Sequence, residues 1–250
     1  MRLQLTFEPR VKVLSDEQIQ DMLKSDSGRA EPRNPGRRTF FRRTAAAVPA
    51  LLLGASAARA NPHMHRLPEL YPGENTTLFQ EILADESAHV EILQALLIDE
   101  DNTLPTRPVP HLRNLAQPDV FAFVRAASAF ENTGAGTYAG ALFAIQQTQE
   151  YFPVAAGLTT VEARHAGFLN ALLNEPLVPD FFPVDTPIPQ SVALSHVDPF
   201  IHDLNGGTVP SFDPVVASDP NNFRIIDFLL LLEMVETAFY QVNVAKFFGG

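Results

Sequence analysis

Apolar residues recur every three or four positions in four segments of the chain, which is the spacing of one face of an α-helix. These segments predict helices at about residues 76–98, 119–148, 154–173 and 222–248. No alternating apolar and polar run of any length indicates a β-strand. The sequence therefore predicts an all-α fold built from four long helices.

The last predicted helix contains four consecutive leucines, residues 229–232, which could suggest a membrane span. Charged residues lie on both sides of them: Arg224, Asp227, Glu233 and Glu236. Because charged side chains inside a bilayer are costly, we expect no transmembrane segment in the mature protein.

A proline-rich segment, residues 174–220, separates the third predicted helix from the fourth. Its nine prolines exclude a continuous helix, although residues 190–204 could form one short helix. Four aromatic residues are scattered through it: Phe181, Phe182, Phe200 and Phe212. We expect the segment to wrap the outside of the bundle with these residues docked, because a free linker would not need them.

The charge of the chain is divided unevenly. The 250 residues contain 18 basic and 29 acidic residues and no cysteine. Residues 1–60 hold 11 of the bases and 6 of the acids, which leaves 7 bases and 23 acids, a net charge of −16, in residues 61–250. This acidity argues against a nucleic-acid partner. The lack of cysteine excludes disulfides, thiolate metal sites and a thiol nucleophile.

The basic segment reads as an export leader. Two arginines at 37 and 38 precede an apolar run at 44–58, which ends in the small-x-small sequence of residues 58–60. This order resembles bacterial twin-arginine signal peptides, which implies export of a folded protein, often around a cofactor, to the periplasm or beyond. A basic amphipathic arm or an uncleaved signal anchor are the alternatives. We therefore divide the chain into a leader, residues 1–60, and one domain, residues 61–250.

Acidic and imidazole side chains lie within the apolar stripes of all four predicted helices. They are Glu86, His89, Glu131, Glu162, His165, Glu233 and Glu236. A carboxylate removed from water is costly unless it is paired or bound to a cation. Only two basic residues, Arg125 and Arg164, lie mid-helix near this set, which is too few to neutralise it. A pair of metal ions would do so.

The spacing supports a metal site. Glu86 and His89 are three residues apart, as are Glu162 and His165, so each pair projects from one face of its helix, about 5–6 Å apart at Cβ. One glutamate from each remaining helix completes a set of four carboxylates and two imidazoles. Carboxylates can be shared by two ions, and imidazole suits iron or manganese.

Four segments carry a resemblance to a known family: Asp85–Val90, Phe130–Gly134, Val161–Ala166 and Leu232–Tyr240. They resemble ferritin-like four-helix bundle proteins, which include desiccation-related and stress-response members. The resemblance covers essentially all of residues 61–250. It implies a centre of two iron or manganese ions with these ligands: Glu86, His89, Glu131, Glu162, His165 and Glu233.

The helix order departs from that family, because the helix that normally comes first has its counterpart last, after the proline-rich segment. This order looks like a circular permutation, and it leaves open whether Glu233 completes the centre in its own chain or in a neighbouring one of a homo-oligomer. We prefer Glu233 to Glu236 as the ligand, because Tyr240, seven residues further on, resembles the tyrosine near ferritin-type metal sites. Glu236 stays an alternative ligand.

Residues around the centre are given ordinary roles. Tyr138 and Tyr240 are expected in the core or beside the ligands, and Arg164 either pairs with a carboxylate or faces solvent. Three acids are expected in solvent: Glu81, Asp85 and Glu91. Three histidines have no carboxylate at ligand spacing on a convincing helix and receive no role: His111, His196 and His202.

These observations predict an exported protein whose dinuclear centre oxidises Fe(II) with O₂ or peroxide, or dismutates peroxide. The sequence assigns no catalytic residue beyond the ligands and does not distinguish iron from manganese. The alternative is a metal-free or non-catalytic protein, stress-protective or structural, in the cell envelope.

Overall fold

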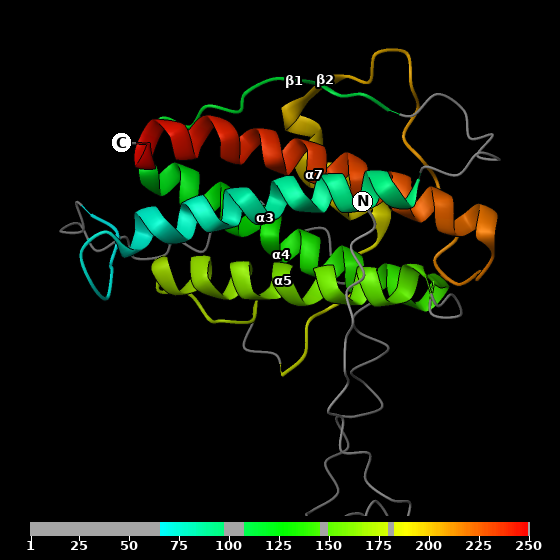
Figure 1. Cartoon of the computed structure of the whole chain (residues 1–250), viewed down its shortest axis with the longest axis horizontal. Coiled ribbons are helices and arrows are strands. Elements are labelled where there is room, and N and C mark those ends of the chain that lie inside the picture. Colours follow the sequence, from blue (N-terminus) through cyan, green and yellow to red (C-terminus); the bar gives the residue numbers. More distant parts are fainter. Residues whose placement is uncertain (1–65, 98–107, 146–149, 180–182, 250) are drawn as a thin grey trace, which may run out of the picture. The chain divides into compact units, whose positions relative to one another are not determined.

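A computed structural model describes residues 66–97, 108–145, 150–179 and 183–249, so the predicted leader lies outside the described residues. Four long helices form a bundle in this part of the chain (Figure 1): α3 Glu74–Leu96, α4 Val120–Ile145, α5 Tyr151–Leu172 and α7 Asp219–Phe248. The prediction of an all-α four-helix bundle is confirmed. No helix among the described residues has the length and apolar character needed to cross a membrane.

The observed helix ends lie within three residues of the predicted ones, and two of the predicted ends, residues 98 and 148, are themselves outside the described residues. Both α5 and α7 begin three residues earlier than predicted. Pro153 and Pro220 then fall in the first turn of their helices. The N–H groups of a first turn have no partner within the helix, so proline is tolerated there.

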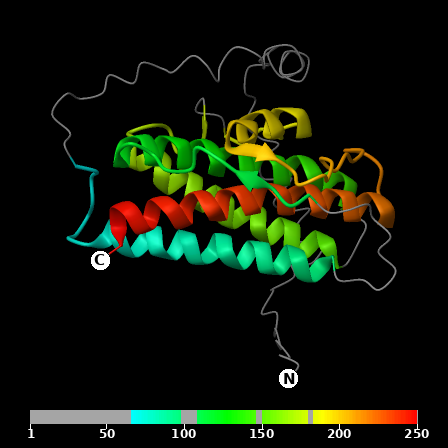
Figure 2. The ribbon, with the colours of Figure 1, turned by 90° about the horizontal axis from the view of Figure 1, so that it is seen from above.

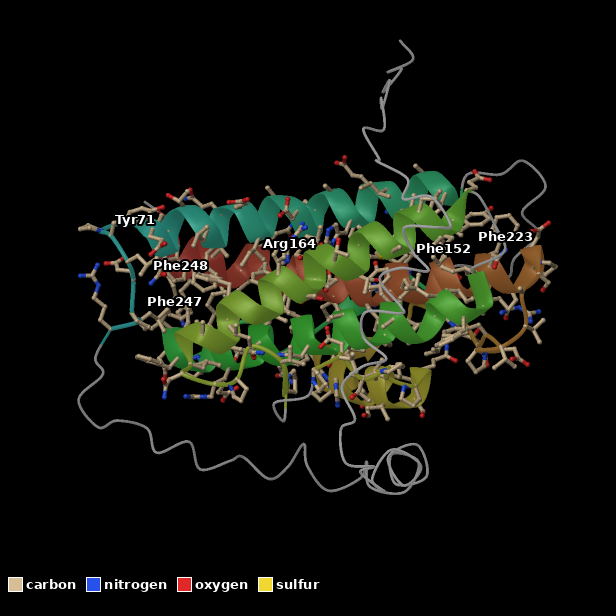
Figure 3. All side chains as sticks on the ribbon, turned by 90° about the horizontal axis from the view of Figure 1, so that it is seen from below. Tyr71, Phe152, Arg164, Phe223, Phe247 and Phe248 are labelled. Carbon is tan, nitrogen blue, oxygen red and sulfur yellow. The ribbon has the colours of Figure 1, made fainter. Side chains whose placement is uncertain are left out.

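The bundle has a polar middle between two hydrophobic clusters. One cluster joins the beginnings of α3 and α4 to the end of α5 and the later part of α7, and the other joins the opposite parts of the same helices. Aromatic residues mark both ends in Figure 3, with Tyr71, Phe247 and Phe248 at one end and Phe152 and Phe223 at the other. All the predicted metal ligands lie near the midpoints of their helices, between the two clusters.

The clusters also show that α3 and α4 run in one direction and α5 and α7 in the other. The connections from α3 to α4 and from α5 to α7 must therefore return along the length of the bundle. They meet in a two-stranded antiparallel ribbon of β1 His111–Leu112 and β2 Ile201–Asp203 (Figure 2). No strand was predicted here, because two or three residues are too few to show alternation.

The predicted short helix at 190–204 is present but ends early. It consists of α6 Gln190–Val197, followed by the 3₁₀ turn η2 Asp198–Phe200. Pro199 ends it, because proline supplies no N–H and crowds the preceding turn. Beyond the turn the chain becomes β2.

The proline-rich segment packs on the bundle as expected. The ring of Phe200 lies 4.9 Å from that of Phe130, and the ring of Phe212 lies 5.7 Å from that of Phe228. Nearby, the Ile188 N–H donates to the Gly136 carbonyl oxygen at 2.8 Å. A Cβ at Gly136 would come within 2.6 Å of the Ile188 side chain, so glycine is what allows this close approach. Phe181 and Phe182 lie outside the described residues.

Candidate metal centre

The middle of the bundle holds six buried metal-ligating side chains, two from each Glu-x-x-His helix and one from each of the others. They are Glu86, His89, Glu131, Glu162, His165 and Glu233, and we call them the central cluster. These are the six residues that the sequence predicts as ligands. The three-residue spacing on α3 and α5 directs both members of each pair to the same side of the helix.

The central cluster divides into two groups of four, within each of which one ligand atom per residue lies within 4.8 Å of the others. The His89 group consists of Glu86, His89, Glu162 and Glu233. The His165 group consists of Glu86, Glu131, Glu162 and His165. Two groups that share the same two carboxylates are the arrangement expected for a pair of neighbouring ions.

In both groups the Nδ1 atom of the imidazole faces the carboxylates. His89 Nδ1 lies 3.1 Å from Glu162 Oε1, 3.3 Å from Glu86 Oε2 and 3.4 Å from Glu233 Oε2. His165 Nδ1 lies 3.0 Å from Glu86 Oε1 and 3.2 Å from Glu131 Oε2. The two rings are 6.3 Å apart, centroid to centroid.

The shared carboxylates are not satisfied by hydrogen bonds. Neither oxygen of Glu86 and neither oxygen of Glu162 has a hydrogen-bond partner among the described residues, although all four atoms are buried. The imidazole nitrogens of His89 and His165 approach these oxygens at 3.0–3.3 Å. Buried carboxylate oxygens without donors are costly unless a cation is present, so these residues fit a metal site.

Arginine and lysine do not neutralise the central cluster. In the described part of the chain, the ion pairs of its carboxylates involve only His89 and His165. Arg164, for which the sequence left two roles open, is exposed on α5 (Figure 3). The positive charge near these carboxylates must therefore come from the two imidazoles or from a bound metal ion.

The two lone glutamates, Glu131 and Glu233, are each held by a tyrosine of the opposite helix. The Tyr240 hydroxyl of α7 donates to Glu131 Oε1 at 2.5 Å, and the Tyr138 hydroxyl of α4 donates to Glu233 Oε1 at 2.5 Å. In each carboxylate the other oxygen, Oε2, faces an imidazole nitrogen. The two tyrosines thus lie beside the predicted ligands, as the sequence predicts. By holding Oε1 of each lone glutamate, they leave its Oε2 facing the imidazole.

The carboxylates differ in their affinity for protons. Burial, together with the negative charges of neighbouring glutamates, raises the pKa of Glu131 and of Glu162 to about 8. Burial raises the pKa of Glu233 to about 7, with the charge of Glu86 adding to it and His89 opposing it. Burial also opposes the ionisation of Glu86, but the imidazoles of His165 and His89, close to its two oxygens, outweigh burial and lower the pKa of Glu86 to about 2.

The imidazoles favour the protonated form when no metal is present. Burial lowers the pKa of His165, but the carboxylates of Glu131 and Glu86 outweigh it and raise the pKa to about 11. The pKa of His89 is also raised, against the effect of burial, by Glu162, Glu233 and Glu86. A metal ion at Nδ1 would therefore have to displace a proton.

Glu236 is buried beside the central cluster but belongs to neither group of four. Its Oε1 has no hydrogen-bond partner among the described residues. Burial raises its pKa well above the usual range, and the nearby charges of Glu131, Glu86, Glu162 and Glu233 raise it further. Glu233 belongs to the His89 group and Glu236 to neither group, and the choice of Glu233 as the ligand stays a prediction.

Asp85 has a partner that the sequence did not reveal. Its side chain is 42% exposed, so it still meets solvent, but its Oδ2 also lies 3.2 Å from Nε2 of His165. A proton on Nε2 donated to Asp85 would leave the lone pair of Nδ1 for a metal. Helical spacing could not reveal this pair, because the two residues belong to different helices. Glu81 and Glu91 are exposed as predicted.

Gly134 makes room for a shared carboxylate, a role that the sequence did not reveal. A Cβ at this position would lie 2.2 Å from Glu162 Oε2 and 3.1 Å from its Cδ. Any larger residue on this face of α4 would have to displace the carboxylate of Glu162. The glycine in Glu131-x-x-Gly134 is therefore part of the site, although it carries no ligand atom.

The three histidines without an assigned role have partners other than the central cluster. The Nδ1 atom of His196 lies 2.6 Å from the Thr133 hydroxyl, and burial lowers the pKa of this histidine. His111 and His202 lie on the β-ribbon. None of the three belongs to the His89 group or the His165 group.

Comparison with known proteins agrees with the fold. A family model described as ferritin-like domain matches residues 39–175, which is more than half of the chain. The match includes α3, α4 and α5 but not α7, so Glu233 lies outside it. It also includes residues 39–60 of the predicted leader, which are outside the described residues. No curated protein and no solved structure matches the chain.

Proposed function

The chain belongs to the ferritin-like domain family, and we propose that it is an exported oxidoreductase with a dinuclear iron or manganese centre. Its reaction would be the oxidation of Fe(II) by O₂ or peroxide, or the removal of peroxide. The observation that carries the proposal is the pair of ligand groups that share Glu86 and Glu162.

Each residue of the central cluster would have a defined role in binding the two ions. Glu86 and Glu162 would be shared by both ions, and the other four members of the central cluster would each bind one. When bound, two iron or manganese ions supply one-electron redox chemistry towards O₂ or peroxide. The hydrophobic clusters on either side exclude bulk water from the centre. Tyr138 and Tyr240 hold the lone glutamates in place through their hydroxyl hydrogen bonds.

Four ionised carboxylates and two neutral imidazoles carry a charge of about −4, which two divalent ions balance. A fifth carboxylate, Glu236, would exceed this balance if it were ionised, and its raised pKa favours the neutral form. The donor set is the same for iron and manganese, so the choice of metal depends on supply and on the redox conditions where the protein is loaded.

Elemental analysis of the natively exported protein tests the proposal. We expect about two ions per chain, and fewer in Glu86→Ala and His165→Ala. The matched control is Glu91→Ala, which removes an exposed glutamate from the same helix as Glu86. Fe(II) oxidation and peroxide consumption should follow the metal content. A wild-type protein that holds no metal after reconstitution would end this proposal.

The alternative is a metal-free, non-catalytic protein that protects or supports the cell envelope under stress. The observation in its favour is that protons and tyrosine hydroxyls can partly satisfy the central cluster without metal. It would be preferred if the folded protein bound iron and manganese weakly and had neither activity.

Export through the twin-arginine route stays a proposal based on residues 37–60. The test is cell fractionation of the full chain and of a variant with lysines in place of Arg37 and Arg38. We expect the wild type in the periplasm or the medium and the variant in the cytoplasm. Equal distribution of the two proteins would refute this route.

A further inference from the structure

The β-ribbon brings together three exposed side chains of residue types that commonly bind metals. His111 on β1 and Asp203 on β2 are partners in the strand register, although they are far apart in the sequence. His111 Nδ1 lies 2.9 Å from Asp203 Oδ1, and His202 Nδ1 lies 2.7 Å from Asp203 Oδ2. Two imidazole nitrogens therefore face one carboxylate. We call His111, His202 and Asp203 the ribbon cluster.

The backbone beneath the ribbon cluster is well anchored. Ile201 is buried in the first hydrophobic cluster, and Leu112 packs against the same cluster. The Arg113 N–H donates to the Phe200 carbonyl oxygen at 2.8 Å, and the Asn114 side chain donates to the Pro199 carbonyl oxygen at 3.0 Å. The positions of the three ligand-bearing residues are thus set by the pairing of the two long connections.

The carboxylate of Asp203 has the charge that a metal ligand needs. In the part of the chain that the structure describes, its ion pairs are only with the two imidazoles, not with arginine or lysine. Its Oδ1 also accepts a hydrogen bond from the Asn205 N–H at 2.8 Å, which fixes its orientation. Hydrogen bonding to His202 and this backbone hydrogen bond lower the pKa of Asp203 to about 2.

We propose that the ribbon cluster is a second metal site, separate from the bundle, for a borderline divalent ion such as Zn²⁺ or Cu²⁺. Two nitrogens and one carboxylate oxygen are a common donor set for these ions, and open positions would be filled by water. The site would hold an ion at the surface where the two connections meet, and so would tie β1 to β2.

Binding requires an adjustment of the side chains, since each imidazole now faces a different oxygen of Asp203. The side chains of His111, His202 and Asp203 are 58%, 67% and 46% exposed. Rotations about side-chain bonds in solvent can close them around one ion without disturbing the core. The hydrogen-bond distances of 2.7–2.9 Å would widen as an ion enters between the donor atoms.

The test is equilibrium dialysis of the full chain against Zn²⁺, with the bound metal counted by elemental analysis. We expect His202→Ala and Asp203→Asn to bind one zinc ion fewer than wild type, or to bind it at least about tenfold more weakly. The matched control is Asp213→Asn. Asp213 is also an exposed loop aspartate that accepts a backbone hydrogen bond, from the Val215 N–H, but no histidine pairs with it in the described residues.

A substitution in the central cluster tests the ribbon site independently of the proposed function. Glu162→Ala should lose metal from the central cluster and keep the ribbon zinc, whereas Asp203→Asn should do the reverse. Cu²⁺ added to Glu162→Ala should give an electron paramagnetic resonance spectrum with coupling to imidazole nitrogen, which His202→Ala weakens. Equal zinc binding by wild type and Asp203→Asn would show that the ribbon cluster only pins the strands by hydrogen bonds, and would overturn the proposal.

Discussion

The His89 group and the His165 group share Glu86 and Glu162 but differ in what surrounds them. His165 contacts Asp85 through its Nε2, and Asp85 immediately precedes Glu86 in the sequence. The corresponding residue before Glu162 is Val161, which cannot support His89 in this way. The ion pairs of His89 among the described residues all involve its Nδ1.

The lone-glutamate helices show a second difference. Both have a tyrosine seven residues after the glutamate, and each tyrosine bonds to the glutamate of the other helix. Three residues after the glutamate, however, α4 has Gly134 and α7 has Glu236. Gly134 leaves space for Glu162, whereas Glu236 adds a buried acid near Glu131. Single neighbouring residues thus give two similar groups of side chains different surroundings.

The largest effect is expected from removing a shared ligand. Glu162→Ala should abolish binding of both ions, because Glu162 belongs to both groups. Glu131→Ala, which belongs only to the His165 group, should remove one. Metal content per folded chain, with circular dichroism to confirm folding, measures both. Retention of one tightly bound ion by Glu162→Ala would contradict the shared arrangement.

The pH should affect the metal-free and metal-loaded proteins in opposite directions. The pKa values of Glu131, Glu162 and Glu233 are raised from about 4.5 to between about 7 and 8. Their contribution to the stability of the metal-free fold is present below about pH 4.5 and is lost as the pH rises through 7 to 8. His165 acts in the same direction, through a folded-state pKa of about 11.

Metal binding displaces the same protons, so metal affinity should increase over this range by about tenfold per pH unit for each proton released. Urea unfolding at several pH values between 5 and 8.5, with and without metal, measures both trends. A metal-free protein whose free energy of unfolding rises steadily from pH 5 to 8.5 would contradict the raised pKa values of Glu131, Glu162 and Glu233.

Gly134→Ala should separate metal binding from helix stability. The new Cβ would displace the Glu162 carboxylate, so metal affinity should fall by about tenfold or more. The matched control is Gly167→Ala on α5, where a Cβ would meet nothing within 4 Å. This control should stabilise its helix by about 0.5–1 kcal/mol and leave the metal content unchanged. Isothermal titration with Mn²⁺ compares the two variants, and equal affinities would exclude a role for Gly134.

The smallest effect is expected from Asp85→Asn, which removes only the negative charge next to Nε2 of His165. One of the two ions should bind about tenfold more weakly while the other is unchanged. Glu81→Gln serves as the control, because Glu81 is an exposed acid one turn earlier on α3. Stepwise Co²⁺ titration followed by its visible absorption distinguishes the two ions. If both ions bound more weakly to the same extent, Asp85 would not act on the His165 group alone, and this prediction would be wrong.

Much of the centre could be predicted from the sequence, because its main signal is local. Glu86 and His89, like Glu162 and His165, are set on one face by helical geometry alone. The apolar stripes around them show that this face is buried. The observed cluster contains all six predicted ligands for that reason.

The partners across helices could not be predicted in the same way. Asp85 had no predicted partner, and only the packing of α3 beside α5 brings it to His165. The role of Gly134 is likewise visible only when the Glu162 side chain lies over it. His111 and Asp203 meet because two long connections run beside each other, and no spacing along the chain encodes that meeting.

The four helices, and the acids and imidazoles on their buried faces, follow from the sequence alone, because helix formation and side-chain spacing depend on near neighbours. Only the packing of the helices places Glu86 and Glu162 in both groups and Glu233 of the same chain in the His89 group. It also decided which tyrosine holds which glutamate. These features depend on the register between helices, which the packing of the two hydrophobic clusters sets.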